Sequence, residues 1–399
     1  MKIHTQRATD RLVGAFLCGI LSLFPWRTRQ VPSGFRPRKI LVILLSEMGS
    51  LALARPMFGR IREKYPEASV HILVFRRNLG FLEVLDLVPK NRRITVDDRS
   101  FSAFFLSSLH ALRGLRRIGI DTVLDGELFS RISSLYSLLS GAKVRAGFHA
   151  HTQEGLYRGG FINRPVLYNP YCHISEQFVH LIESIDRQGK PLVKETMPSR
   201  AAPVDLLKVA PEEIDAFSQV FQKDFPHLRD RRLVLVCPGG GMLPIRAWPR
   251  KYYEEVVNAL LESGYAVGVI GLERDKALAG AILSACRNEF CLDLTGYTKT
   301  VKDLILLFHL ASLLISNDGG PGHFASMTPI PAIVIYGPET PTLYGVLGPK
   351  SRVLYNPVSC SPCLTAYNHR RSPCDGNNVC LKGISPRDVL EEVYEFLRK

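Results

Sequence analysis

Short apolar runs alternate with amphipathic stretches along most of this chain. Runs typical of buried strands lie at residues 40–45, 70–75, 93–96, 122–124, 233–237, 266–270, 291–294, 313–316 and 332–336. Segments with helical spacing lie between and after them, at residues 52–65, 81–85, 101–118, 252–261 and 387–398. Strands that alternate with helices favour parallel sheets. The pattern predicts the α/β class, with two Rossmann-like doubly wound domains.

The polar segment that separates the two halves contains Pro191, Pro198 and Pro203. We therefore predict an N-terminal domain over residues 39–190, a linker over 191–204 and a C-terminal domain over 205–399. A cysteine-containing loop is expected at residues 360–380 of the second domain, and residues 1–38 are set apart as an N-terminal segment.

Residues 12–24 of that N-terminal segment are apolar and have basic residues on both sides. The stretch is shorter than the roughly 20 residues that span a bilayer, and no small-x-small cleavage site follows it. Two interpretations remain: a helix packed on the protein's own core, or a helix lying in a membrane interface. The flanking arginines favour the interfacial helix and a membrane-associating segment.

The formal net charge of +14 indicates an anionic partner. Nucleic acid, a nucleotide-sugar and an anionic membrane surface would each suit such a charge. No nucleic-acid-binding motif and no basic helix interleaved with aromatic residues occurs in the 399 residues. The charge therefore favours a nucleotide ligand and the membrane surface, and no nucleic acid partner is expected.

The stretch Asn-Asp-Gly-Gly-Pro-Gly-His-Phe-Ala, which starts at Asn317, carries the most functional information. A helix beginning near Pro321 would direct free backbone N–H groups toward Asp318, Gly319 and Gly320, where a diphosphate could bind. The carboxylate of Asp318 would repel phosphate, so sugar hydroxyls are its better partner. An N-capping acid at a simple turn is the alternative interpretation.

A second junction of this kind follows the predicted strand at residues 233–237. Gly239 and Gly240 stand in its turn, and Arg246 and Trp248 follow before the next helix. Ligands of doubly wound sheets bind at the carboxyl ends of the strands, where both junctions would lie. Trp248 is expected in the core.

In four segments the chain resembles glycosyltransferase family 9, the ADP-heptose:lipopolysaccharide heptosyltransferases and their relatives. The similar segments are residues 39–50, 125–148, 238–249 and 317–338. The pattern Asn-Asp-x-Gly-Pro-x-His-x-Ala and the apolar run that ends in Tyr336-Gly337-Pro338 are the most specific of them. The resemblance implies the GT-B architecture, in which two Rossmann-like domains face across a cleft, and an inverting transfer of a sugar from an ADP-sugar.

The resemblance also implies that the C-terminal domain binds the donor and the N-terminal domain binds the acceptor. Arg246 matches a family lysine that contacts the phosphates, and an arginine keeps the charge and adds bidentate reach. The backbone N–H groups of Gly319, Gly320 and Gly322 would complete the site, so no metal is required for catalysis. Ser130 and Arg131 match a stretch that lines the acceptor side.

The chain departs from the family at the general base. Family members usually carry an aspartate directly after the glycine of the first turn, and Ser50 stands there in this chain. A serine cannot accept the proton unaided, so Glu47 in the same turn is the first candidate base. Glu127, which stands on the acceptor side, is a second candidate, and a protein without a base is the third interpretation.

Three further residues keep two interpretations each, and a fourth, Glu339, has one. His323 either touches a leaving-group oxygen or is bonded to backbone at the helix start. Thr295 and Gly296 either line the nucleoside pocket or form a plain turn. Glu339 follows Gly337-Pro338 at another strand end, close to where a sugar or ribose could lie.

Cys360, Cys363, Cys374 and Cys380 cluster near the C-terminus. The first two have C-x-x-C spacing, but the ten and five intervening residues of the other gaps match no standard zinc signature. A structural zinc or iron–sulfur cluster, reduced thiols packed in the loop, and disulfides all remain open.

The sequence thus predicts a glycosyltransferase that moves a sugar, with heptose favoured, to a lipopolysaccharide-core or other glycolipid acceptor at the cytoplasmic face of the inner membrane. A catalytically impaired nucleotide-sugar or glycolipid binding protein on the same fold is the alternative. A basic metal-loop protein that binds nucleic acid is a third, remote hypothesis.

Overall fold

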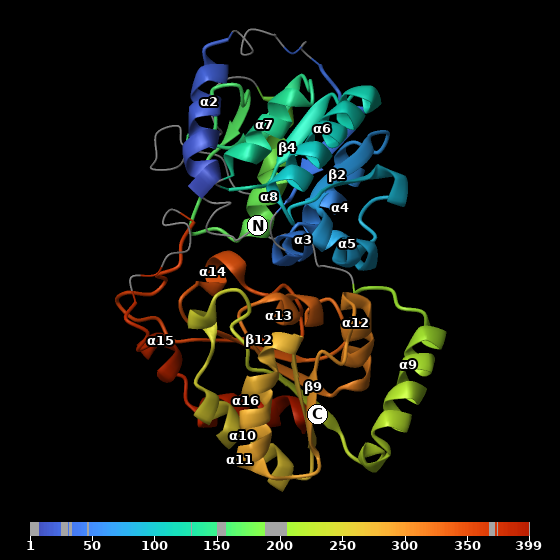
Figure 1. Ribbon diagram of the computed structural model, residues 1–399, viewed down its shortest axis with the longest axis vertical. Coiled ribbons are helices and arrows are strands. Elements are labelled where there is room, and N and C mark those ends of the chain that lie inside the picture. The colour runs from blue at the N-terminus through green and yellow to red at the C-terminus, as the bar shows by residue number, and fades with distance from the viewer. Residues whose placement is uncertain are drawn as a thin grey trace. The chain divides into compact units, whose positions relative to one another are not determined.

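A computed structural model of the chain describes residues 8–24, 31, 34–45, 48–128, 130–149, 157–187, 206–366, 372 and 374–398. The chain divides into two compact units, Met1–Pro203 and Val204–Lys399 (Figure 1). The predicted linker at 191–204 lies outside the described residues.

The first unit is built on a parallel six-stranded sheet of order β3-β2-β1-β4-β5-β6. Its strands are β1 (Lys39–Ile43), β2 (Ser69–Phe75), β3 (Arg93–Val96), β4 (Thr122–Asp125), β5 (Val144–Phe148) and β6 (Arg164–Val166). Its helices are α2 (Ala15–Ser22), α3 (Met48–Leu53), α4 (Arg55–Lys64), α5 (Leu79–Leu85), α6 (Phe101–Ile118), α7 (Arg131–Leu139) and α8 (Ile174–Glu183). A π-helical turn, η1 (Asp10–Gly14), precedes α2.

The second unit repeats this plan with the sheet order β12-β11-β10-β7-β8-β9. Its strands are β7 (Leu233–Cys237), β8 (Ala266–Gly271), β9 (Cys291–Thr295), β10 (Leu313–Asn317), β11 (Ala332–Tyr336) and β12 (Ser351–Tyr355). Its helices are α9 (Pro211–Asp224), α10 (Arg250–Glu262), α11 (Lys276–Cys286), α12 (Val301–Leu310), α13 (Gly320–Ala325), α14 (Pro341–Tyr344), α15 (Val379–Lys382) and α16 (Pro386–Leu397).

The predicted fold class is confirmed, because both sheets are entirely parallel and have the same strand order. In each unit the first strand, β1 or β7, pairs on one side with the second strand and on the other with the fourth. The direction of chain progression therefore reverses between β1 and β4, and between β7 and β10. Such switch points are where open parallel sheets bind their ligands, at the carboxyl ends of the strands.

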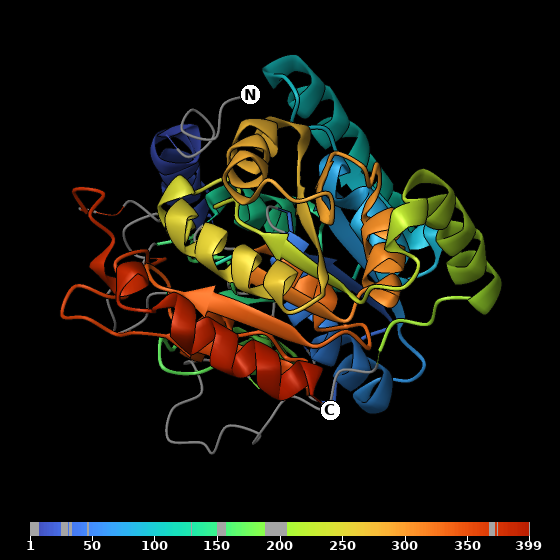
Figure 2. The same ribbon diagram turned by 90° about the horizontal axis from the view of Figure 1, so that it is seen from below.

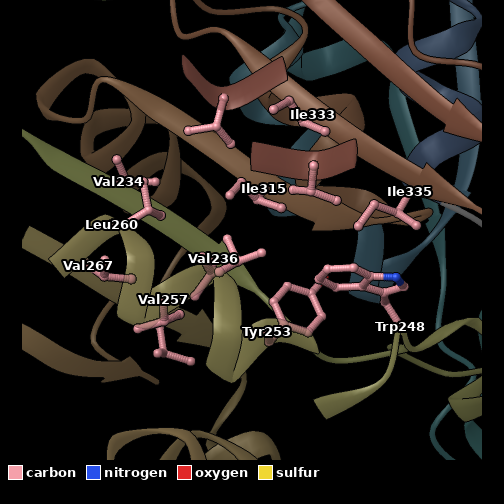
Figure 3. Close-up of a cluster of buried hydrophobic side chains, with 14 of the residues drawn as sticks. Val234, Val236, Trp248, Tyr253, Val257, Leu260, Val267, Ile315, Ile333 and Ile335 are labelled. Atoms are coloured by element: carbon pink, nitrogen blue, oxygen red, sulfur yellow. The ribbon is translucent and has the colours of Figure 1, made fainter. Parts of the chain in front are cut away.

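A core of aliphatic strand residues and helix residues holds the second sheet in place (Figure 3). Trp248 is buried there as predicted, at 2% exposure, and its indole N–H donates to the carbonyl of Ile384 at 2.9 Å. The predicted C-terminal helix also packs back on this core: α16 buries Val389, Val393 and Leu397 and lies beside α10 (Figure 2).

None of the helices within the described residues has both the length and the apolar character needed to cross a membrane.

Candidate functional site

The two loops at the switch point of the second sheet are tied together by Asn317, the last residue of β10. Its side-chain amide donates to the carbonyls of Pro238 at 2.9 Å and Gly239 at 3.2 Å, in the loop that follows β7. Its side-chain oxygen accepts hydrogen bonds from the Trp248 backbone N–H and the Tyr253 hydroxyl, each at 3.0 Å. An aspartate could not donate to the carbonyls, so an amide is needed here.

Three charged side chains meet beside this junction. The Arg246 guanidinium lies 2.7 Å from a carboxylate oxygen of Glu339 and 3.5 Å from one of Asp318. Arg246 ends a short 3-10 turn, Asp318 directly follows β10, and Glu339 follows β11. The side chains are only 14%, 6% and 3% exposed for Arg246, Asp318 and Glu339. We call Arg246, Asp318 and Glu339 the charged cluster.

The charged cluster is chemically suited to a ligand that is partly anionic and partly rich in hydroxyls. Its two carboxylates are hydrogen-bond acceptors, which suit the hydroxyl groups of a sugar. A guanidinium has five N–H donors in a planar fork, a geometry that matches phosphate oxygens as well as carboxylates. Sequence reasoning singled out each of the three residues, but it did not show that Arg246 bridges the two acids.

The predicted site glycines fall into two groups. A Cβ on Gly240 would lie 2.7 Å from the Leu243 carbonyl oxygen, and one on Gly322 would lie 2.9 Å from Val334, so close packing within the unit explains both. A Cβ on Gly319 would meet nothing nearer than 3.9 Å. Gly319, next to Asp318, therefore has room for a Cβ without a clash.

The other two predicted site glycines of this edge also approach protein atoms. A Cβ on Gly239 would lie 3.3 Å from the Asp275 carboxylate, and one on Gly320 would lie 3.1 Å from the Phe324 ring. The predicted helix near Pro321 is present as α13, but it has only six residues and a correspondingly small dipole. His323 lies inside it and is buried, at 5% exposure.

Thr295 and Gly296 lie farther along the same edge, at the end of β9. The Thr295 backbone N–H donates to the Asp293 carboxylate at 2.9 Å, and Gly296 has φ +69°. A turn therefore accounts for their local structure. β8 separates β9 from β7, which places the pair about 10 Å from the switch point at the usual strand spacing.

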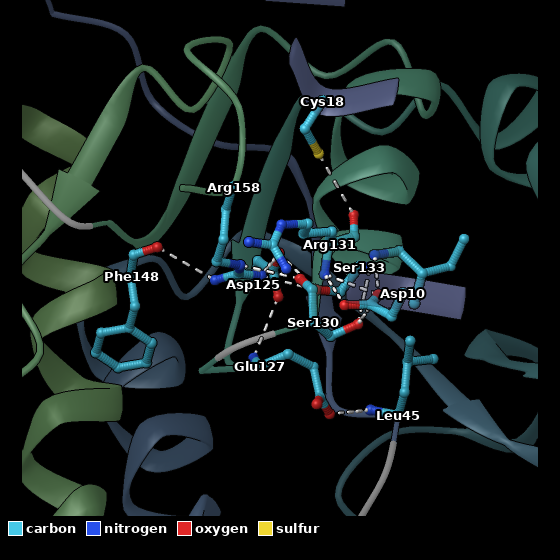
Figure 4. A network of polar contacts seen from close by, with 11 residues as sticks. Asp10, Cys18, Leu45, Asp125, Glu127, Ser130, Arg131, Ser133, Phe148 and Arg158 are labelled. Atoms are coloured by element: carbon cyan, nitrogen blue, oxygen red, sulfur yellow. Dashed lines mark hydrogen bonds and ion pairs between the residues drawn. The ribbon is translucent and has the colours of Figure 1, made fainter. Parts of the chain in front are cut away.

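At the switch point of the first sheet, Glu127 links the ends of two strands (Figure 4). Its carboxylate accepts a hydrogen bond from the Leu45 backbone N–H, 2.7 Å away and just past β1, while Glu127 itself follows β4. Ser50 lies half-buried in the first turn of α3. Glu47 lies outside the described residues. Glu127 is thus a carboxylate held at the edge where the acceptor side is predicted.

The backbone of Glu127 is hydrogen-bonded to one member of a buried ion pair. Asp125, at the end of β4, contacts Arg158, and both side chains are almost completely buried. Asp125 also accepts hydrogen bonds from Ser133 Oγ at 3.0 Å and the Glu127 backbone N–H at 3.1 Å. Burial raises the pKa of the Asp125 carboxyl to about 6, although the neighbouring Arg158 guanidinium lowers it. No local sequence pattern indicates this pair, because Arg158 lies 33 positions from Asp125.

Ser130 and Arg131, predicted on the acceptor side, begin α7 and contact the N-terminal segment. The carboxylate of Asp10 accepts hydrogen bonds from the backbone N–H groups of Arg131 and Ile132 at 2.9 and 2.8 Å, and from Ser130 Oγ at 3.4 Å. The Arg131 side chain donates to the carbonyl of Tyr157 at 3.0 Å. Both residues therefore make contacts within the first unit, and the hydrogen bonds to Asp10 hold η1 against α7.

The N-terminal helix therefore has a feature that agrees with each of the two interpretations of its sequence. Cys18 is fully buried, which agrees with a helix packed on its own unit. Leu12, Phe16 and Leu23 are 72%, 66% and 85% exposed on the other side, which agrees with an apolar face turned outward.

Asp10 is expected to stabilise the first unit, because it satisfies the free N–H groups at the start of α7. Asp10→Ala should lower the free energy of unfolding by about 1–2 kcal/mol, as the loss of a helix cap does. Urea unfolding measures this, with the exposed neighbour Arg11→Ala as the control. An unchanged midpoint for Asp10→Ala would mean that the N-terminal segment does not dock as described.

The four C-terminal cysteines do not form a compact ligand set in the described part of the chain. No three His, Cys, Asp or Glu side chains there lie close enough together to hold a metal ion. Cys360 and Cys374 are exposed, Cys363 is half-buried, and Cys380 is buried. Burial raises the pKa of the Cys380 thiol, and the nearby Cys363 and Cys360 raise it further.

Comparison with known proteins gives a consistent result. The family model described as glycosyltransferase family 9 (heptosyltransferase) matches residues 111–371. The lipopolysaccharide heptosyltransferase 2 of Salmonella typhimurium is 25% identical over 373 residues, covering 90% of this chain and 98% of that protein.

Two solved structures share the fold. That of Escherichia coli ADP-heptose lipopolysaccharide heptosyltransferase II superimposes with a TM-score of 0.68 and 22% identity, covering 90% of this chain and 98% of the other. A second E. coli heptosyltransferase, solved with ADP, has a TM-score of 0.62 and 18% identity, with 90% and 99% coverage.

Proposed function

Since the chain belongs to glycosyltransferase family 9, we propose that it transfers a heptosyl group from ADP-heptose to a lipopolysaccharide-core or other glycolipid acceptor, with inversion at the anomeric carbon. The chain is a glycosyltransferase, and the relatives named above are heptosyltransferases that it matches over almost their whole length. The sugar, the nucleotide and the acceptor class are our assignments for this chain.

The observation that carries the proposal is the charged cluster beside Gly319, a glycine that is not tightly packed against other protein atoms. A nucleoside diphosphate sugar presents anionic phosphates next to a sugar rich in hydroxyls. Arg246 would neutralise charge on the departing diphosphate, and Asp318 and Glu339 would accept hydrogen bonds from the sugar hydroxyls. Fixed donors and acceptors in a buried setting stabilise developing charge without reorganising.

Transfer also needs a base for the acceptor hydroxyl. Glu47 remains our first candidate and Glu127 the second. Glu127 is supported by its place at the switch point and by the bond from Leu45, which orients its carboxylate. Ser50 has no proton-accepting role in this scheme.

Gly319 provides a test of donor placement. Its backbone is extended (φ 169°), so alanine can adopt it, and the added methyl would come no nearer than 3.9 Å to another protein atom. If a diphosphate lies against this glycine, Gly319→Ala should weaken ADP binding about tenfold and leave the thermal unfolding midpoint unchanged. Calorimetric titration with ADP measures the affinity.

Gly322→Ala serves as the contrasting variant for this experiment. Its methyl would press on Val334 in β11, so the variant should lose stability. Wild-type ADP affinity in Gly319→Ala would place the diphosphate elsewhere.

The competing assignment is a binding protein without transfer chemistry, which Ser50 at the family's aspartate position motivates. Release of ADP from ADP-heptose in the presence of a heptose-deficient glycolipid acceptor separates the two. Acceptor-dependent ADP release supports the transferase, whereas ADP-heptose binding without release supports the binding protein.

We further propose that catalysis needs no metal ion, since Arg246 and backbone N–H groups provide the positive charge. A structural zinc ion or iron–sulfur cluster at Cys360, Cys363, Cys374 and Cys380 stays a separate proposal. Metal analysis of the purified protein, followed by activity measurements after chelation, tests both statements.

We also propose that the protein acts at the cytoplasmic face of the inner membrane and associates with it peripherally. A glycolipid acceptor would be embedded there, and the exposed apolar residues of the N-terminal helix support such an association.

A further inference from the structure

The N-terminal helix exposes an unusual amount of hydrocarbon. Leu23 is 85% exposed, and six other apolar side chains of η1, α2 and the two residues after them are also exposed: Leu12, Val13, Phe16, Leu17, Ile20 and Phe24. We call these seven residues the apolar face. Contiguous exposed apolar patches on soluble proteins mark interaction sites far more often than scattered single residues do.

The opposite side of the helix is fixed on the first unit, so the apolar face cannot turn inward. A Cβ on Gly14 would lie 2.9 Å from Arg131, which shows how closely the two helices pack. Cys18 is fully buried, and Ser22 Oγ accepts a hydrogen bond from the Gly160 backbone N–H at 2.8 Å. With Asp10 at the start of α7, these contacts hold the helix along its length (Figure 4).

A shallow cavity of about 540 Å³ opens beside the last turn of this helix. Leu21 of α2 forms one wall, and Leu138 and Leu139 at the end of α7 form another. Arg116 and Lys143 bring two exposed cations to its rim. The cavity thus combines aliphatic walls with positive charge, directly next to the apolar face.

The acidic residue that lines this cavity, Asp121, already accepts hydrogen bonds within the protein. The Asp121 carboxylate accepts hydrogen bonds from the backbone N–H groups of Arg38 and Lys39 at 2.9 and 3.0 Å. Arg116 uses its Nε to donate to the Leu139 carbonyl at 2.9 Å, which holds the guanidinium at the cavity. An anionic group with an attached hydrocarbon chain complements this arrangement.

We infer that the apolar face inserts into the interfacial region of an anionic phospholipid bilayer, and that the cavity at Arg116 and Lys143 takes a lipid phosphate headgroup. The helix would lie in the membrane plane, with its apolar side chains among the upper acyl chains. Arg11, exposed on the same helix, adds to the attraction, as does the net charge of +14. A second copy of the chain fits less well, because pairing would bring these like charges together.

This inference rests on the proposed function only in that a glycolipid acceptor gives the enzyme a reason to bind membranes. The surface itself does not include the charged cluster. Donor binding and membrane binding can therefore be measured, and fail, independently.

Flotation with vesicles tests the inference. Wild-type protein should float with vesicles of phosphatidylcholine and phosphatidylglycerol, and much less with phosphatidylcholine alone. The triple variant Leu12→Ser, Phe16→Ser, Leu23→Ser should reduce the bound fraction at least tenfold, because it removes three inserting side chains. Lys143→Glu should weaken binding several-fold at low salt, with a smaller effect at high salt.

Matched controls lie on the second unit. Val220→Ser changes a 54% exposed apolar residue of α9, and Lys350→Glu makes the same charge reversal at another exposed lysine. Both should float like wild type, and the triple variant should keep wild-type ADP affinity. Equal losses in the controls would overturn the inference.

Two other results would also contradict the inference. Unchanged flotation of the triple variant, combined with a lower unfolding midpoint, would assign the apolar face to the protein's own interior. A wild-type dimer that dissociates in the triple variant, without any vesicle binding, would assign it to a second copy. Normal flotation in a protein that fails to bind ADP would leave the inference standing and reject the proposed function.

Discussion

Arg246→Met is expected to abolish measurable heptosyl transfer and to destabilise the second unit. The substitution leaves Asp318 and Glu339, which are 6% and 3% exposed, facing each other without the guanidinium between them. Removing one partner from a buried charge group costs about 3–5 kcal/mol. Urea unfolding measures the stability, and ADP release from ADP-heptose measures the activity.

Arg246→Lys separates the catalytic loss from the structural loss. Lysine keeps the positive charge but lacks the planar fork that can reach a carboxylate and a phosphate together. This variant should fold with nearly wild-type stability while kcat falls by roughly ten- to hundredfold, the equivalent of about 1.5–3 kcal/mol. Wild-type kcat in Arg246→Lys would restrict Arg246 to a structural role.

Glu47→Gln is expected to lower kcat by roughly 10²–10⁴ while ADP affinity stays unchanged, because loss of a general base affects the chemical step and leaves donor binding intact. The measurement is steady-state transfer, together with calorimetric titration of ADP. Ser50→Ala should change kcat little, and Ser50→Asp should restore part of the activity of Glu47→Gln by returning a carboxylate to the family position.

Glu127→Gln is the matched comparison for the base. The glutamine oxygen can still accept the hydrogen bond from Leu45, so the local structure should persist. A large loss of kcat in Glu127→Gln together with normal turnover in Glu47→Gln would move the base to Glu127. Normal turnover in both variants would exclude each of them as the base.

The alternation of apolar runs predicted the two parallel sheets well, since buried strands and amphipathic helices have distinct periods. β7 and β11 have the predicted bounds, and α6 covers the predicted residues 101–118. The strand predicted at 313–316 is β10, but α12 directly before it was not predicted, because an apolar run alone does not distinguish a buried helix from a strand.

The sequence also indicated the three residues of the charged cluster, but not the ion pairs between them. Arg246, Asp318 and Glu339 were each placed near a strand end, yet nothing in their spacing predicts that one guanidinium bridges two acids. Asn317 appeared only as part of a motif, and the four hydrogen bonds described above reach residues 64 to 79 positions away. Contacts of this range depend on the sheet order, which local patterns do not encode.

The N-terminal segment shows the same limit. Its apolar character suggested either a core helix or a membrane helix, and the helix has one buried face and one exposed apolar face. Asp10 decides how the helix docks, through hydrogen bonds to Arg131 and Ile132 more than 120 positions away. No period within residues 8–24 could have revealed that partner.

Mass spectrometry of the acceptor tests the central claim most directly. The purified protein is incubated with ADP-heptose and a lipopolysaccharide acceptor that lacks the corresponding heptose, alongside the Asp318→Asn variant. Transfer predicts an acceptor heavier by one heptosyl residue with wild-type protein, and a rate at least tenfold lower with Asp318→Asn. An acceptor of unchanged mass, from a folded protein that binds ADP-heptose, would contradict the assignment of this chain as a heptosyltransferase.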